Sequence, residues 1–300
     1  MTSPTTSSPS PKKKLTWLIT GCSSGFGLSL ARIAQAVGHT VIATSRSPSR
    51  TPELVSEIES AVTGSRWLSL DVDSPESAQT IEDLEASGRQ IDVLVNNAGF
   101  SLLAPAETFA EDELRAHMET MYFGPLRLIR AVLPHMRARR FGVIVNISTG
   151  AALEGRESMG AYAGAKAALD GLSKVLAKEV APFNIRVLTI GMGAFNTNMP
   201  NAVRPGGHDA PLPADYRGSA AEQIMQLISG DKMVPSGDKD KAMRAVYELV
   251  VGEGRAGAGL EAERYLPLGS DMVTRVKEVR DYLQHSLDVF DVGNSVGIDK

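Results

Sequence analysis

Two hydroxyl residues, a tyrosine and a lysine lie in one short stretch, residues 146–166, which reads NISTGAALEGRESMGAYAGAK. Tyr162 and Lys166 are four residues apart, so on a helix they share one face. A phenol with its ordinary pKa of about 10 is a poor acid or base at neutral pH, and a nearby ammonium favours the phenolate. The pair could therefore perform general acid–base chemistry. On this stretch alone, an ordinary tyrosine and lysine on a helix surface explain the pattern equally well.

A glycine-rich loop near the N-terminus favours the chemical interpretation. The apolar run 15–20 leads directly into TGCSSGFG at 20–27, and a helical pattern follows. In this context glycines permit a tight turn, let a pyrophosphate approach the backbone and let the helix pack on the sheet. The loop residues predicted to hold a dinucleotide are Gly21, Ser23, Ser24, Gly25, Phe26 and Gly27.

The second expected strand, 40–45, ends at the position that would contact the adenosine ribose. Arg46 lies 19 residues after Gly27, near the spacing of about 20 at which the ribose is recognised. NAD(H) would require a carboxylate there, whereas the chain offers Ser45 and Arg46, and a guanidinium suits a 2′-phosphate. The sequence therefore favours NADP(H) over NAD(H), with a solvated surface arginine as the alternative.

An alternation of strands and helices must position these residues. Short, β-branched apolar runs alternate with amphipathic helical segments, which is typical of parallel strands buried on both faces. The expected strands are 15–20, 40–45, 66–72, 91–98, 142–148 and 185–191. We predict an α/β fold, a doubly wound Rossmann-type parallel sheet with helices on both faces, in a single domain with a C-terminal helical and lid extension.

The ends of the chain differ from this core. Residues 1–14 are rich in Ser, Thr, Pro and Lys and predict a disordered tail before a domain over 15–300. Within that domain, 198–230 is expected to form a substrate loop or lid, with a long Pro- and Gly-rich loop at 201–218, and 231–300 a C-terminal extension. Helices are expected near 219–230 and 238–251 and from Asp271.

Composition excludes several classes of protein. A net charge of −4 and a pI near 5.8 argue against nucleic-acid binding. The single cysteine, Cys22, rules out an intramolecular disulfide and suits a reducing, cytoplasmic location. No apolar run approaches the ~20 residues that span a bilayer, so no membrane association is expected. The scattered histidines predict no metal site: His39, His117, His135, His208 and His285.

Three motifs in order resemble the short-chain dehydrogenase/reductase family: TGCSSGFG, NNAG at 96–99 and YAGAK at 162–166. AVLPHMRARRFGVIVNIS and RYLPLGSDMV resemble its 17β-hydroxysteroid-dehydrogenase-like and retinol-dehydrogenase-like branch. The resemblance covers about 15–290 and implies that Tyr162 acts as acid or base. It also implies that Lys166 tunes the tyrosine, with help from the positive nicotinamide, and hydrogen-bonds the nicotinamide ribose.

The resemblance assigns further roles. The family's hydroxyl residue that holds the substrate oxygen lies 13 residues before the tyrosine, at Thr149, with Ser148 as the alternative. Because successive strand residues point to opposite faces, only one of the two is expected to serve. Asp71 and Val72 are expected near the adenine, although Asp71 could instead have a capping or loop role. Thr197 is expected to hold the nicotinamide carboxamide, with a cap after a turn as its alternative. The residues expected along the adenosine ribose are Asn97, Ala98 and Gly99.

Two positions depart from the family pattern. Met121 stands where relatives carry an asparagine that supports a proton relay, which predicts slower reprotonation but not inactivity. Met192 stands where a proline is usual after the sixth expected strand, close to where the nicotinamide would bind.

Together these features predict an NADP(H)-dependent oxidoreductase that interconverts a carbonyl and an alcohol on an apolar small molecule. The substrate-contact candidates are Phe100, Ser101, Met159, Met192 and the 198–230 loop. The alternatives are a non-redox isomerase, dehydratase or cyclase built on the same pair, and a cofactor-binding regulatory protein. A homodimer or homotetramer through helices carrying 108–138 and 160–180 is also implied by the resemblance.

Overall fold

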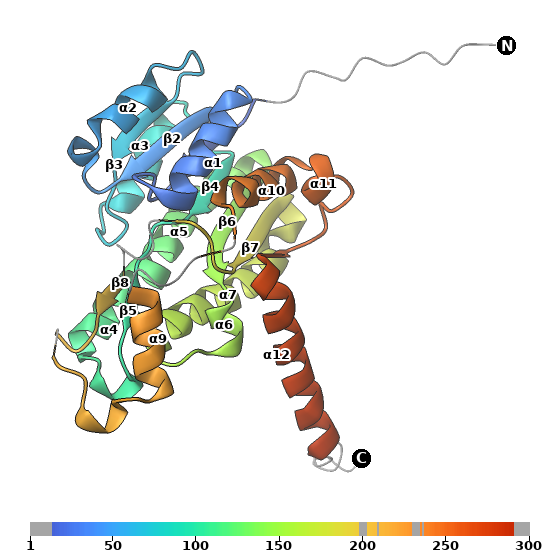
Figure 1. The fold of residues 1–300 in the computed structure, drawn as a ribbon. Coiled ribbons are helices and arrows are strands. Elements are labelled where there is room, and N and C mark those ends of the chain that lie inside the picture. Colours follow the sequence, from blue (N-terminus) through green and yellow to red (C-terminus); the bar gives the residue numbers. More distant parts are fainter. Residues whose placement is uncertain (1–13, 198–202, 209, 230–234, 236, 291–300) are drawn as a thin grey trace.

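The computed structural model describes residues 14–197, 203–208, 210–229, 235 and 237–290. Almost all of the expected tail therefore lies outside the described residues. So do parts of the expected lid, at 198–202, 209 and 230. The core of the molecule is a parallel β-sheet with helices on both faces (Figure 1), which confirms the expected doubly wound Rossmann-type fold.

The main sheet has seven strands in the order β3-β2-β1-β4-β6-β7-β9. Their bounds are β1 Thr16–Ile19, β2 Thr40–Ser45, β3 Arg66–Ser69, β4 Val93–Asn96, β6 Gly142–Thr149, β7 Ile185–Met192 and β9 Tyr265–Leu268. Every neighbouring pair is parallel. The strand order changes direction between β1 and β4, and ligands of such sheets bind beyond the carboxyl ends of the strands at that point.

The seventh strand, β9, carries no strand pattern in the sequence. β9 is four residues long and contains Pro267, and it pairs with β7 only, from Thr189↔Tyr265 to Met192↔Leu268. A proline is tolerated there because β9 is an edge strand. Three expected strands are also shorter than predicted, since β1 covers Thr16–Ile19, β3 ends at Ser69 and β4 covers Val93–Asn96.

The alternation of side chains along each strand divides the core into two layers. Trp17 packs in the cluster beneath α1 (Gly25–Ala36) and α10 (Lys239–Val251). Its neighbour Leu18 packs on the opposite face, in the cluster formed with α3 (Ser77–Ala86), α5 (Gly124–Arg139) and α7 (Gly160–Val180). Because both faces are covered, the strands are apolar almost without interruption.

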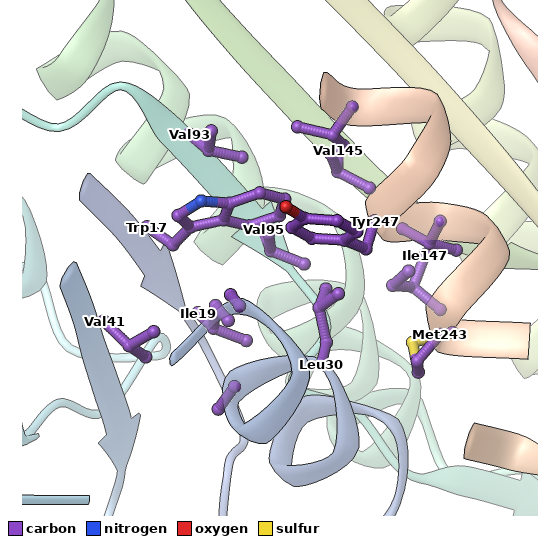
Figure 2. Close-up of a cluster of buried hydrophobic side chains, with 14 of the residues drawn as sticks. Trp17, Ile19, Leu30, Val41, Val93, Val95, Val145, Ile147, Met243 and Tyr247 are labelled. Carbon is purple, nitrogen blue, oxygen red and sulfur yellow. The ribbon is translucent and has the colours of Figure 1, made fainter. Parts of the chain in front are cut away.

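Figure 2 shows how the C-terminal part of the chain completes the first layer. The ring of Tyr247 stacks on Trp17 with centroids 5.9 Å apart and an interplanar angle of 19°, and Met243 packs beside Leu30 in the same cluster. At the start of α10 the Asp238 carboxylate caps the helix by accepting from two backbone N–H groups. The helix α10 is thus part of the core.

A second, two-stranded parallel sheet lies beyond the main one. It pairs β5 (Ser101–Leu103) with β8 (Val203–Pro205), and Figure 1 shows both beside α4 (Glu111–Met118) and α9 (Ala220–Ser229). The expected loop 201–218 therefore contains a short strand. The sequence could not show it, since three residues carry no readable period and their partner lies about 100 residues away.

The remaining helices are peripheral. They are α2 Pro52–Glu59, α6 Ala151–Glu154, α11 Gly254–Gly257 and α12 Ser270–Val289. Helix α12 starts against α6, where Met272 is buried, and then extends away from the body (Figure 1). In the part of the chain that the structure describes, no helix is both long and apolar enough to cross a membrane.

Candidate active site

A cavity of about 600 Å³ opens at the carboxyl ends of the strands. It runs from the loop between β1 and α1, past the ends of β4, β6 and β7, to α7 and α9. All the catalytic and cofactor residues expected from the sequence line this cavity except Gly27. Segments that lie far apart in the sequence therefore meet in one place.

The glycine-rich loop forms a cradle at one end of the cavity. Gly21 has a φ of +70°, and a Cβ there would lie 2.9 Å from the Ala98 Cα, so a side chain would not fit. Gly25 begins α1 with a φ of +59°, and a Cβ there would meet only Thr197 within 4 Å. The first turn of α1 thus faces open space, as the binding of an anionic group at a helix N-terminus requires.

Gly27 differs from the prediction, because it lies behind the loop and does not line the cavity. A Cβ at this position would stand 2.5 Å from the Gly21 carbonyl oxygen and 2.6 Å from the Asn97 Nδ2. Gly27 therefore allows α1 to pack closely under the loop, and its contribution to binding is indirect.

Asn97 fixes the loop to the end of β4. Its side-chain Nδ2 donates to the Thr20 carbonyl oxygen at 2.8 Å, and its backbone N–H donates to the Thr20 hydroxyl at 2.9 Å. The Ala98 N–H donates to the same hydroxyl at 2.9 Å. This part of the NNAG motif therefore holds the cradle in shape while it lines the cavity.

Two arginines stand at the end of the cavity beyond β2 and β3. Arg46 was expected there, and Arg50, which the sequence analysis did not identify, lines the same wall four residues later. The Ser45 hydroxyl accepts a hydrogen bond from Trp67 Nε1 at 3.0 Å. Burial raises the pKa of the nearby Asp73 carboxyl, and the charge of Arg46 partly offsets that rise.

Asp71 and Val72 line the same end of the cavity. The Asp71 carboxylate also accepts the Asp73 N–H at 3.2 Å, and its carbonyl accepts the Ser74 N–H at 3.1 Å. Asp71 thus shapes the loop after β3 and also faces the cavity, while its contact with an adenine ring stays a prediction.

Tyr162 is buried at the base of the cavity beside Thr149. Burial raises the pKa of the phenol to about 12, and a hydrogen bond with Thr149 lowers it in part. The lowering of this pKa by the Lys166 ammonium together with the positive nicotinamide of a bound cofactor stays a prediction. Among the chain's own residues, burial has the largest effect on the phenol, and it favours the protonated form.

Lys166 is also buried and lines the same cavity. Its Nζ donates to the Ile147 carbonyl oxygen at 2.6 Å, which turns the ammonium toward the end of β6. Burial lowers the pKa of Lys166 to about 8, although the charge of Asp170, one helical turn further on, raises it in part. Asp170 is a neighbour that the motif alone did not identify.

The two candidate hydroxyls, of Thr149 and Ser148, have different neighbours. Thr149 lies beside Tyr162, and its Oγ1 also accepts the Ala151 N–H at 3.3 Å. Ser148 is only 2 % exposed and faces Asp170, whose pKa it lowers against the effect of burial. Successive residues of β6 thus point to opposite sides, and Thr149 is the one next to the phenol.

Met121 and His117 form the wall behind the tyrosine. Met121 lies in the π-helical turn Glu119–Phe123, is 1 % exposed and packs in a cluster with Met159 and Tyr162, so it fills core space. His117 is fully buried between the rings of Phe100 and Tyr162, at centroid distances of 4.7 and 6.2 Å. Neither of its ring nitrogens has a hydrogen-bond partner among the described residues.

Burial, together with the charges of Lys166 and Arg204, lowers the pKa of His117 to about 4 from its usual 6.5. Between these two values the unfolded chain binds a proton that the folded chain does not, so stability falls as the pH falls. We expect His117→Gln to reduce the loss of unfolding free energy between pH 7 and 5 by about 2 kcal/mol. Urea unfolding of both proteins at both pH values measures this, and an unchanged pH dependence would contradict it.

The other end of the cavity is lined mainly by apolar side chains, with Arg156 and Arg204 among them. Phe100, Ser101, Met159 and Met192, all expected near the substrate, line it, and α9 adds Ile228. Phe26 of the loop packs edge-on against Phe195 at 5.5 Å, which closes the side near Thr197. Within the described ranges, no group of three or more His, Cys, Asp or Glu side chains is placed to hold a metal ion.

Comparison with known proteins agrees with this arrangement. The model of the short chain dehydrogenase family matches residues 16–207. The chain is 40% identical to oxidoreductase claN of Passalora fulva over 217 residues, 72% of this chain and 96% of that protein. It is 35% identical to retinol dehydrogenase 8 of Bos taurus over 214 residues, 70% of this chain and 62% of that protein.

Two solved structures show the same fold. A short-chain dehydrogenase from Streptomyces avermitilis is 35% identical, with a TM-score of 0.83 over 96% of this chain and all of that one. A gluconate 5-dehydrogenase from Burkholderia cenocepacia, solved with NADP and tartrate, is 25% identical. Its TM-score is 0.69, over 88% of this chain and 97% of that one.

Proposed function

The chain belongs to the short-chain dehydrogenase family of carbonyl and alcohol oxidoreductases, and from this premise we propose that it is an NADP(H)-dependent reductase of an apolar carbonyl compound. The observation that carries the proposal is the meeting of Tyr162, Thr149 and Lys166 at the base of a cavity whose other end is the glycine-rich cradle. An acid and a nucleotide site in one cavity suit hydride transfer coupled to proton transfer.

The residues fit a phosphorylated dinucleotide. Gly21 and Gly25 leave room for a pyrophosphate at the start of α1. Arg46 and Arg50 place two guanidinium groups near the position of the adenosine ribose, and guanidinium groups bind phosphate well. When bound, NADPH supplies the hydride for the carbonyl carbon.

The chain's own side chains would manage the proton and the developing charge. Tyr162, protonated because its pKa is raised to about 12, donates its hydroxyl proton to the carbonyl oxygen as that oxygen gains charge. Thr149 holds the same oxygen by a hydrogen bond. The Lys166 ammonium, held by the Ile147 carbonyl, stabilises the phenolate that Tyr162 becomes.

A panel of apolar aldehydes and ketones tests the proposal by the consumption of NADPH. The reductase interpretation expects nicotinamide oxidation in proportion to alcohol formed. Product without any change at the nicotinamide absorbance would favour an isomerase, dehydratase or cyclase. Tight NADPH binding without any turnover that depends on Tyr162 would favour a regulatory protein.

The cofactor preference is expected to depend on Arg46. Arg46→Ala should weaken NADPH binding about 10- to 100-fold and leave NADH binding nearly unchanged, because only the 2′-phosphate loses a charge-assisted contact. Titration of the protein fluorescence with each cofactor measures this. Arg32→Ala is the control, since Arg32 pairs with Glu57 outside the cavity. An equal loss for both cofactors would contradict the assignment.

Two further proposals rest on the sequence. We propose a cytoplasmic location, which the presence of a single cysteine, Cys22, supports. Cys22 is buried and burial raises its pKa to about 12, so it is a packing thiol. Assembly into a homodimer or homotetramer would use the helices over 108–138 and 160–180, on or beside which Phe123 and Val175 are exposed.

A further inference from the structure

The arginines of the cavity have different partners. Those that line it are Arg46, Arg50, Arg156, Arg204 and Arg275. Arg46 and Arg50 stand at the adenosine end, and Arg275 is neutralised by Glu154 at 2.9 Å and Asp271 at 3.0 Å. Arg156 and Arg204 form no ion pair with any described carboxylate. Two positive charges therefore remain available at the substrate end.

Arg204 is held in place by aromatic rings. Its guanidinium lies over the Phe100 ring, 4.3 Å from the centroid, and Phe100 packs edge-on against His117 at 4.7 Å. Pairing of β8 with β5 fixes the backbone at Leu102↔Arg204. A cation over an aromatic face keeps its N–H groups free at the ring edge. Arg204 is thus pre-oriented, two rings away from Tyr162.

Arg156 lies on a loop that hydrogen bonds of Ser158 attach to two neighbouring segments. The Ser158 carbonyl accepts the Ala104 N–H at 3.0 Å, and the Ser158 hydroxyl donates to the Ala221 carbonyl at 2.9 Å. The Arg156 carbonyl in turn accepts the Met159 N–H at 3.1 Å. The loop is therefore tied to β5 and α9, the two elements that form the substrate end.

The cavity wall around the two arginines is largely apolar. The charge of Arg156 partly offsets the rise that burial causes in the pKa of the Glu154 carboxyl, but Glu154 is already ion-paired with Arg275 at 2.9 Å. Met159, Met192 and Ile228 are each at least nine-tenths buried and face the same end of the cavity. The carboxylates that line the cavity are Asp71 and Asp73, both at the adenosine end. An apolar pocket with unpaired cations at one end suits a ligand that is itself apolar and negatively charged at one end.

We propose that the substrate carries an anionic group, a carboxylate or a phosphate, which Arg204 and Arg156 bind while its apolar body leads to the carbonyl beside Tyr162. This inference rests on the proposed reductase function. It makes the two arginines specificity residues, and it distinguishes the substrate from neutral apolar ketones and alcohols.

Three matched substrates test the inference: a medium-chain ω-oxo fatty acid, its methyl ester, and an ω-oxoalkyl phosphate of the same length. We expect kcat/KM for the better anion to exceed that for the ester about 10- to 100-fold, the usual effect of charge-assisted contacts. The identity of the better anion distinguishes carboxylate from phosphate. In Arg204→Met and in Arg156→Met the ratio of kcat/KM for the anion to kcat/KM for the ester should fall toward one.

Arg115→Met is the matched control, because Arg115 lies on α4 and is paired with Glu111 outside the cavity. It should leave the preference intact. Equal use of ester and anions by the native protein, or a preference that survives in both variants, would overturn the inference while leaving the reductase function in place.

A failure of the proposed function gives a different result. If none of the three compounds leads to consumption of NADPH, the anion site can still be tested by binding. The affinities of the protein with NADPH for the corresponding saturated fatty acid, alkyl phosphate and methyl ester are then compared. Affinity for an anion that falls in Arg204→Met supports the anion site. Equal affinity for the ester and both anions contradicts it.

Discussion

Replacing Tyr162 by phenylalanine should lower kcat for carbonyl reduction about 10²- to 10⁴-fold, the usual contribution of a positioned general acid. The substitution removes only the hydroxyl, whose raised pKa keeps it protonated and ready to donate. The ring remains packed in its cluster with Met121 and Met159. NADPH affinity should stay close to the native value, so the loss should appear in kcat. Single-turnover NADPH oxidation at saturating substrate measures it.

Tyr282→Phe is a suitable control, since Tyr282 is exposed on α12. It should keep the native rate. Thermal unfolding of Tyr162→Phe shows whether the variant is still folded. Its melting temperature should stay near the native value, because removal of the hydroxyl leaves no large cavity. A Tyr162→Phe enzyme that reduces carbonyls at the native rate would refute the mechanism.

The sequence predicts most of the sheet because its strands are buried on both faces. Runs such as 40–45 and 142–148 are too apolar and β-branched for other assignments, and both are strands in the structure. β9 was missed for the opposite reason. It is a short edge strand with a proline, and only its pairing with β7 makes it a strand. Long-range pairing of this kind leaves no local period to detect.

Some positions of the site can likewise be predicted from the sequence, and others cannot. Glycine, tyrosine and lysine positions follow from spacing, because local turns and one helix face fix them. The preference for Thr149 over Ser148 follows from the family's count of 13 residues before the tyrosine, and the alternation of β6 adds only that one of the two is expected to serve. The direction of the Lys166 ammonium cannot be predicted from the sequence, since it depends on a hydrogen bond to the Ile147 carbonyl 19 residues away. Arg204 owes its position to Phe100 and β5, and no motif includes it.

The position of Lys166 predicts an alkaline limit on reduction. The ammonium that stabilises the Tyr162 phenolate exists below a pKa of about 8 and is lost above it. We therefore expect kcat to be constant between pH 6 and 7 and to fall as the pH rises through about 8. Lys166→Met should lower kcat about 10²- to 10³-fold, because a preorganised charge next to the reacting group is lost. The pH profile of single-turnover reduction measures both effects.

The shape of the profile separates a catalytic role of Lys166 from a structural one. A merely structural lysine would lower the rate at every pH and leave the limit near 8 in place. Loss of the titrating ammonium should instead make the profile of Lys166→Met flat through that range. Lys178→Met, an exposed lysine on the same helix, should keep the native limit. A limit near pH 8 that persists in Lys166→Met would assign it to another group, and Lys166 would then have no role in stabilising the phenolate.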